Sequence, residues 1–261
     1  MRLTVVGCAG SFPGPDSPAS CYLVEADDTA GRTWRVVLDL GNGSLGPLQR
    51  YTRLTELDAV LISHLHPDHF ADLCGLYVAL RYDPERGGSV QVPVHGPTGT
   101  AQRIAEAYGR PEGTGMGRQL AVQEWTAGTP VRVGPLTITP YPVRHPVEAY
   151  GLRVEGPGPD GGTRVLAYTG DTDDCPGLDV LASGADLLLA EAAFEEGRDD
   201  GVRGIHLTGR RAGQVAARTG ARRLVLTHLP AWNDPARALA DARVVYDGPL
   251  ELAHPGAVLD V

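Results

Sequence analysis

The chain has 261 residues, of which 23 are basic and 32 acidic, and its formal net charge is −9. A negative chain lacks the broad positive field of general nucleic-acid binders, so large polyanionic partners such as tRNA are disfavoured. No apolar run is long enough to cross a bilayer and no secretory leader is recognisable, which predicts a cytoplasmic protein without a membrane partner.

Apolar runs typical of buried strands alternate with segments of helical periodicity, and no linker-like segment divides them. We therefore expect one domain over residues 1–261, with an α/β fold of two sheets between layers of helices. Thr208 is a predicted N-cap and Gly220 a predicted left-handed C-terminal residue of one helix. The predicted strands cover residues 3–6, 21–25, 35–38, 59–62, 90–94, 136–140, 164–168, 187–190 and 224–227, and the predicted helices cover residues 71–82, 100–108, 178–183, 209–219 and 235–243.

The segment "LISHLHPDHF", residues 61–70, places three histidines and an aspartate directly behind a predicted strand. Pro67 prevents one helix from carrying all four groups, and an extended chain before it directs His64 and His66 to the same side. Asp68 and His69 then open the following helical segment. A polar loop with solvated histidines is the alternative, but packing gives no reason for such a cluster, whereas a metal site does.

Three further ligand-type residues, His145, Asp171 and His228, each follow a separate predicted strand. Together with the first cluster they make seven candidate ligands. A four-coordinate zinc ion needs at most four protein groups, so seven candidates indicate two ions better than one.

This ordered set resembles the metallo-β-lactamase superfamily, whose HxHxDH motif, later single histidine, aspartate of a "GDT" turn and final histidine are all matched. The resemblance implies a four-layer αββα sandwich that holds two divalent metal ions, with Zn²⁺ favoured and Mn²⁺ or Fe also compatible with nitrogen and oxygen ligands. It also implies that Asp171 bridges the ions. The implied ligands are His64, His66 and His145 for the first ion, and Asp68, His69 and His228 for the second.

Within the superfamily the chain is similar to the branch of RNase Z, the tRNA 3′ endonuclease, and class II-like cyclic nucleotide phosphodiesterases. The "EAT" and "HST" elements of that branch resemble residues 191–193 and 206–208, and "GPTG" at residues 96–99 also fits. More narrowly, "GCAGSFPGPDSPASCYLV", "LDLGNGSLGPLQR" and "THLPAW" resemble actinobacterial proteins described as atypical cyclic AMP phosphodiesterases.

The resemblance implies hydrolysis of a small cyclic nucleotide, with cyclic AMP favoured, by a hydroxide between two metal ions. RNase Z differs in having basic residues in its first glycine loop and, in bacteria, a long basic arm. Here the first loop is acidic at Asp16, and one helix and two strands leave only residues 109–118 as loop between residues 100 and 144. We therefore expect a small phosphodiester as substrate, and we allow for a homodimer.

The predicted catalytic residues are Asp68, His206 and Glu191. By resemblance His206 lies beside the leaving-group oxygen, where an imidazolium can donate a proton, and Glu191 orients it. A histidine in a helix-capping loop is the alternative. Asp39 is either a hydrogen-bond partner of a ligand histidine or a turn-forming residue, and the glycine-rich residues 7–14 are expected to shape the rim of the site.

The remaining histidines, His95 and His254, are not assigned to the metals, because a lone loop histidine ordinarily lies at the surface or in a turn. Three other functions stay open: an RNase Z-like endonuclease, a hydrolase of lactones or thioesters, and a non-catalytic nucleotide- or metal-binding protein.

Overall fold

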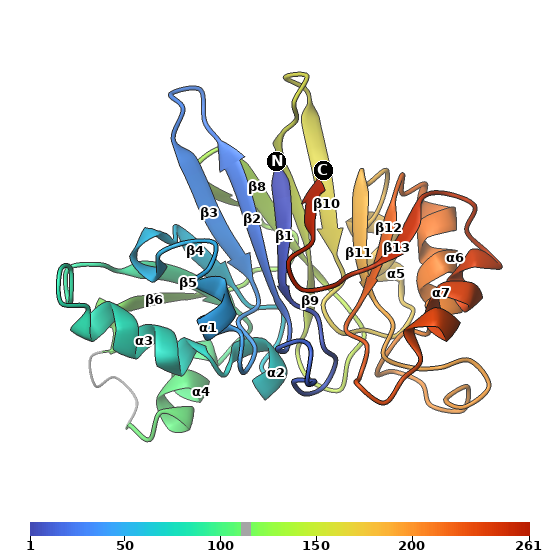
Figure 1. Ribbon diagram of the computed structural model, residues 1–261, viewed down its shortest axis with the longest axis horizontal. Coiled ribbons are helices and arrows are strands. Elements are labelled where there is room, and N and C mark those ends of the chain that lie inside the picture. Colours follow the sequence, from blue (N-terminus) through green and yellow to red (C-terminus); the bar gives the residue numbers. More distant parts are fainter. Residues whose placement is uncertain (111–115) are drawn as a thin grey trace.

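Two stacked β-sheets form the centre of the computed structural model, which describes residues 1–110 and 116–261 (Figure 1). The first sheet has the strand order β14-β1-β2-β3-β4-β5-β6, and the second has the order β13-β12-β11-β10-β9-β8-β7. The strands of the first sheet are β1 (Arg2–Gly7), β2 (Cys21–Asp27), β3 (Thr33–Leu38), β4 (Ala59–Leu61), β5 (Val92–Gly96), β6 (Leu120–Glu124) and β14 (Val258–Asp260). Those of the second sheet are β7 (Val131–Val133), β8 (Leu136–Pro142), β9 (Tyr150–Pro157), β10 (Thr163–Tyr168), β11 (Leu187–Glu191), β12 (Leu224–Thr227) and β13 (Leu250–Leu252).

Helices cover the outer face of each sheet, so the predicted four-layer αββα sandwich is confirmed (Figure 1). Among the helices of the described residues, none is both long and apolar enough to span a membrane. Beside the first sheet lie α1 (Leu45–Leu48), α2 (Pro67–Phe70), α3 (Leu73–Tyr82) and α4 (Thr100–Ala107), with the short 3₁₀ turns η1 (Leu54–Glu56) and η2 (Met116–Arg118); beside the second lie α5 (Pro176–Leu181), α6 (Gly209–Thr219) and α7 (Pro235–Arg243).

The β11 strand shows why its sequence is apolar at successive positions. Leu187 and Leu189 point into the core between the two sheets, whereas Leu188 and Ala190 pack under the helices of the second half. Side chains alternate across a strand, so a central strand covered on both faces is apolar throughout. Such runs are strong sequence signals, and the strand predicted at residues 187–190 is confirmed.

The predicted ends of α6 are confirmed. The Thr208 hydroxyl accepts a hydrogen bond from the Arg211 backbone N–H at the N-terminus, and Gly220 ends the helix with φ +68°. These caps fix where the preceding loop, which carries His206, meets the helix.

Some elements were missed from the sequence. The described part of residues 100–144 contains three strands rather than two, and β9, β13, β14, α1 and α2 were not predicted. Most are short or half-exposed, so their apolar periodicity is weak. In the predicted loop 109–118, residues 111–115 lie outside the described residues.

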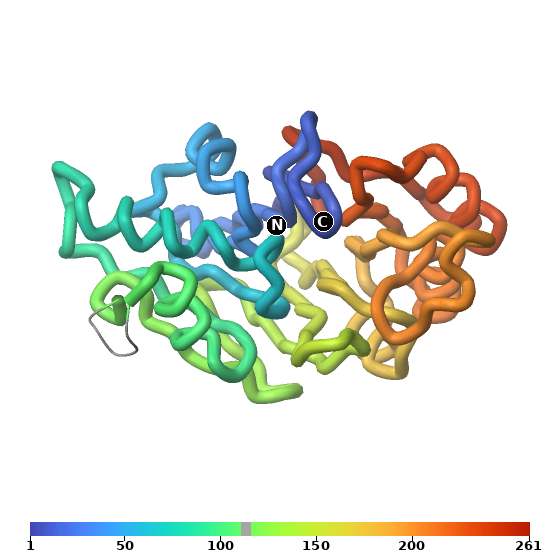
Figure 2. The backbone as a smooth tube through the Cα atoms, turned by 90° about the horizontal axis from the view of Figure 1, so that it is seen from below, coloured from blue at the N-terminus to red at the C-terminus, as the bar shows by residue number. Residues whose placement is uncertain are grey.

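Strand direction brings the candidate ligands to one edge of the sandwich. In the first sheet β3 and β4 are parallel, and in the second sheet β10, β11 and β12 are parallel. The strand β8 runs in the same direction as β10, because both are antiparallel to β9, which lies between them. The carboxyl ends of these strands therefore meet at the lower edge in Figure 1, beside α2. Figure 2 views this edge directly, with the first half of the chain mainly on the left and the second half on the right.

Candidate metal centre

Three imidazoles, His64, His66 and His145, converge between the two sheets. Nδ1 of His66 lies 3.0 Å from Nε2 of His64 and 3.1 Å from Nε2 of His145. Two nitrogens bound to one tetrahedral zinc ion lie about 3.3 Å apart, since each Zn–N bond is about 2.0–2.1 Å. These three ring nitrogens therefore have nearly the spacing that one metal ion requires.

The protonation of this first cluster also suits a metal. Burial lowers the pKa of His64, His66 and His145, in the last case to about 4, so the rings are neutral near pH 7. Nδ1 of His145 lies 2.9 Å from the carbonyl oxygen of Ile205, which can only accept a hydrogen bond. The proton is therefore on Nδ1, and Nε2 presents its lone pair to the cluster.

A second group gathers Asp68, His69, Asp171 and His228, all of them buried. Nε2 of His69 lies 3.3 Å from carboxylate oxygens of both aspartates, and Nε2 of His228 lies 3.1 Å from Oδ2 of Asp171. Within the described residues, Nε2 of His69 and Oδ1 of Asp171 are among the few buried side-chain atoms without a hydrogen bond. Buried polar atoms are rarely left unpaired, and a bound cation would satisfy both.

Asp171 lies between the two groups. Its Oδ2 is 3.1 Å from Nε2 of His228 in the second group and 3.7 Å from Nε2 of His64 in the first. Burial opposes ionisation of this carboxyl, but its electrostatic interactions with His228 and His69 outweigh burial and hold its pKa well below the usual range. A fixed negative charge is thus available to both groups.

Asp39 orients His69 of the second group through a hydrogen bond on the side of the ring away from that group. Its Oδ2 accepts hydrogen bonds from Nδ1 of His69, from the Tyr168 hydroxyl and from the Ser63 hydroxyl, each at 2.7 Å, and its Oδ1 accepts from the Ser63 backbone N–H. The bond from Nδ1 of His69 fixes the tautomer that turns Nε2 toward Asp171. Asp39 thus has the predicted contact with a candidate ligand histidine.

A third group lies beside Asp171 and contains the predicted proton donor. Nδ1 of His206 is 2.8 Å from Oε1 of Glu191, and the fully buried Glu191 carboxylate also accepts from the backbone N–H groups of Thr172 and Ala193. Burial opposes protonation of His206, but the charge and hydrogen bond of Glu191 outweigh it and raise its pKa to about 9. His206 is therefore protonated at neutral pH.

The non-glycine residues with positive φ in the described chain are Ser11, Asp39 and His228, with φ of 62°, 55° and 57°. Such backbone is uncommon for these residues and clusters at functional sites. His228 is a candidate ligand, Asp39 orients His69, and the Ser11 backbone N–H lies 3.3 Å from Nε2 of His228. The glycine-rich loop thus reaches the site, as predicted.

The structure brings all seven candidate ligands together, with Glu191 and His206 beside them; their chemical roles stay predictions. His95 and His254 are outside these groups. His95 is buried on β5 and stacks on Trp125, so its predicted place at the surface or in a turn is wrong, because the strand extends two residues further than predicted. Sequence reasoning missed the partners Ser20, Ser63 and Tyr168, because isolated hydroxyls carry no recognisable spacing.

We predict that Asp39→Ala weakens metal binding by about 10- to 100-fold, the usual effect of removing a hydrogen-bond partner of a metal ligand. Without Asp39, Nδ1 of His69 keeps only the longer contact with the Ser63 hydroxyl, at 3.5 Å, so Nε2 is held less firmly toward the second group. Competition with a chelator measures the affinity, and Tyr168→Phe, which removes only one bond to Asp39, serves as a milder control. Unchanged affinity in Asp39→Ala would show that His69 is oriented by other contacts.

Comparison with known proteins agrees with this geometry. Residues 34–229 match the family model described as "Beta-lactamase superfamily domain". The uncharacterized protein ML1173 of Mycobacterium leprae is 41% identical over 264 residues, covering 100% of this chain and 89% of its own. Ribonuclease Z of Myxococcus xanthus is 28% identical over 309 residues, covering 100% of this chain and 98% of its own.

The probable metallo-hydrolase YhfI of Bacillus subtilis is 30% identical over 259 residues, with 99% of both chains covered. Its crystal structure superposes with a TM-score of 0.85 at 28% identity, covering 99% of this chain and 98% of that one. From the matched family model, these relatives and the His/Asp clusters, we conclude that the chain belongs to the beta-lactamase superfamily and has the fold of a metallo-hydrolase.

Proposed function

We propose that the protein is a dinuclear metal-dependent phosphodiesterase that hydrolyses a cyclic nucleotide, with 3′,5′-cyclic AMP preferred, to the nucleoside monophosphate. The observation that carries the proposal is the convergence of two ligand groups on the shared carboxylate of Asp171. Two metal ions held about 3.5–4 Å apart suit in-line displacement at phosphorus.

Each of the two ligand groups would hold one ion. The first ion would be held by the first group of three imidazoles, and the second by Asp68, His69 and His228, with Asp171 serving both. Bound ions would lower the pKa of water toward neutrality and polarise the phosphoryl oxygens. The nitrogen and oxygen donors suit Zn²⁺, and Mn²⁺ or Fe fits the same donor types.

The His206–Glu191 pair supplies the proton for the leaving group. With its pKa raised to about 9, His206 is protonated at neutral pH, and its Nδ1–H donates a hydrogen bond to Glu191. The remaining donor is Nε2–H. A positioned imidazolium can deliver such a proton as the ester oxygen departs, and the alkoxide of a ribose is a poor leaving group without it.

We predict that His206→Ala lowers kcat by roughly 10²- to 10⁴-fold on cyclic AMP, the range expected for loss of a general acid. The loss should shrink on bis(p-nitrophenyl) phosphate, since nitrophenolate departs without a proton. Steady-state kinetics on both substrates measure the difference, and His254→Ala, at an exposed histidine, is the matched control. Equal losses on the two substrates would assign His206 a structural role.

Substrate size separates the proposal from tRNA processing. The relative named Ribonuclease Z matches the full length of this chain, so an RNA substrate is the second candidate. An RNA substrate needs several phosphate contacts remote from the metals. The chain has a net charge of −9 and an acidic first loop. The described residues between Gly99 and His145 are mostly taken up by α4, β6, β7 and β8, which leaves little length for a long basic arm. A cyclic nucleotide needs only one phosphate contact, which bound ions would provide.

We predict that the fully metallated protein hydrolyses cyclic AMP and cleaves precursor tRNA little or not at all at physiological salt. Product analysis by chromatography and by gel electrophoresis tests both substrates, and a lactone and a thioester in the same panel test the remaining hydrolase reactions. Efficient 3′ trimming of tRNA with cyclic AMP untouched would reverse the choice. Inactivity on every substrate at full metal content would favour a binding protein.

A further inference from the structure

We infer that Phe194 and Trp232, with Phe12 packed against Trp232, hold the base of the nucleotide by stacking; these three residues are here called the aromatic subsite. The inference rests on the proposed function, since it assigns a place to the nucleoside part of that substrate. It is carried by a cavity beside His206, by the aromatic side chains around it, and by the loops that hold them.

A cavity of about 390 Å³ opens beside the third group of residues, with Ser11, Phe194, His206 and Trp232 in its wall. Sites for small molecules usually have volumes of about 300–1,000 Å³ and apolar or aromatic linings with a few polar groups. Because His206 forms part of the wall, whatever receives its proton must lie at this side of the metal centre. The rest of the leaving group then extends into the cavity.

The aromatic side chains are placed for a planar ligand. The Phe194 ring meets His206 edge to face, with ring centroids 5.0 Å apart and an interplanar angle of 81°. Trp232 is 67% exposed, although its ring contacts that of Phe12 at a centroid distance of 4.7 Å. A largely exposed tryptophan at the wall of a cavity offers a face on which any base can stack.

The loops that carry these rings are tied to the metal centre. Phe12 follows Ser11, whose N–H contacts His228, and Trp232 lies four residues after His228. The backbone N–H of Gly10 donates to the carbonyl oxygen of Leu229 at 3.1 Å, which joins the two loops. The aromatic pair is therefore held near a candidate ligand rather than on an independent flap.

The charges around the cavity favour a neutral group over a second phosphate. Arg198 contributes a guanidinium to the wall, but it forms ion pairs with Asp199 at 2.7 Å and Glu195 at 3.2 Å. Its remaining bond goes to the side chain of Asn233 at 3.0 Å. With this cation already neutralised, stacking is the main attraction that the cavity offers, and a nucleobase fits it.

The first test compares cyclic AMP with methyl ribofuranoside 3,5-cyclic phosphate, a cyclic ester in which a methoxy group replaces the base. We expect Trp232→Ala to lower the ratio of kcat/KM for cyclic AMP to that for the base-free ester by about 5- to 100-fold, as loss of one stacking contact would. Trp232→Phe should restore most of the ratio. An unchanged ratio in Trp232→Ala overturns the inference.

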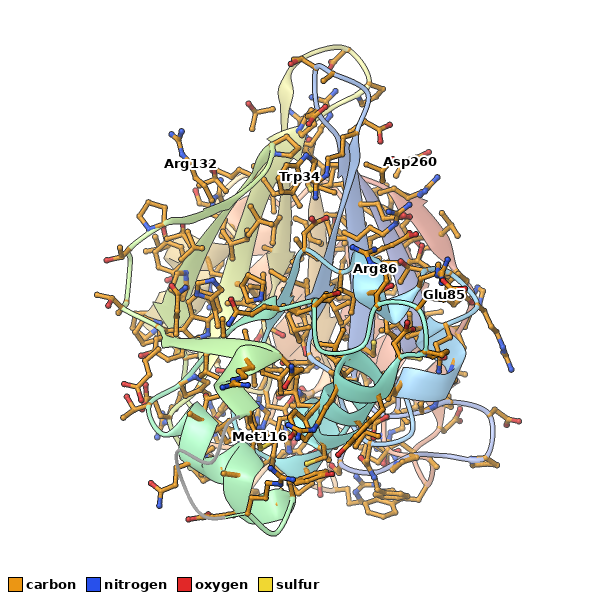
Figure 3. The ribbon with its side chains drawn as sticks, turned by 90° about the vertical axis from the view of Figure 1, so that its left-hand side faces the viewer. Trp34, Glu85, Arg86, Met116, Arg132 and Asp260 are labelled. Carbon is orange, nitrogen blue, oxygen red and sulfur yellow. The ribbon has the colours of Figure 1, made fainter. Side chains whose placement is uncertain are left out.

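The second test needs no turnover. Adenosine monophosphate added to the metal-loaded protein should quench the tryptophan fluorescence, and Trp232→Phe should abolish the quenching. Trp34 is the matched control, because it lies toward the opposite end of the molecule from the metal centre (Figure 3). Trp34→Phe should leave the fractional quenching of Trp232 in place, and quenching that survives in Trp232→Phe would overturn the inference.

The two tests also separate this inference from the proposed function. If the wild type hydrolyses neither cyclic ester, the phosphodiesterase proposal fails, while the nucleotide-dependent quenching of Trp232 still decides the subsite. If the wild type hydrolyses cyclic AMP but Trp232 neither responds to the nucleotide nor affects the ratio, the subsite alone is wrong.

Discussion

The buried carboxylate of Asp171 is the group on which the arrangement of the site depends. It lies within 3.1–3.7 Å of imidazole nitrogens from both ligand groups, and each group combines residues that follow strands of both sheets. Burying a carboxylate among histidines is costly unless its charge is compensated. Divalent ions at this point would compensate it and also join the two halves of the sandwich, so metal binding and the stability of this edge should be linked.

The surroundings of the ligands are as specific as the ligands themselves. Asp39 fixes His69, and Glu191 fixes His206, each through a buried carboxylate that also accepts backbone hydrogen bonds. Close backbone approach adds a second constraint. A Cβ on Gly41 would lie 1.9 Å from the carbonyl oxygen of Asp68, and one on Gly10 would lie 2.2 Å from that of His228. Only glycine fits at these positions, because any side chain would displace a candidate ligand.

The layers and the candidate ligands were predictable from the sequence because their signals are local. The apolar run of β11 is continuous, and the histidines and aspartates stand directly after predicted strands, whose carboxyl ends a parallel arrangement brings together. Short edge strands such as β7 and β14 were not predictable from the sequence, because a strand of three residues shows no recognisable apolar periodicity. Ser63 and Tyr168 come from distant segments and meet only through tertiary packing, as do Phe12 and Trp232 in the aromatic subsite.

Anomalous diffraction from crystals of the zinc-loaded protein, measured above and below the metal absorption edge, tests the central claim most directly. The account predicts two peaks in each chain, one among His64, His66 and His145 and one among Asp68, His69 and His228, with an oxygen of Asp171 about 2.0–2.2 Å from each ion. A single peak under excess metal, or two peaks that Asp171 does not join, would contradict it.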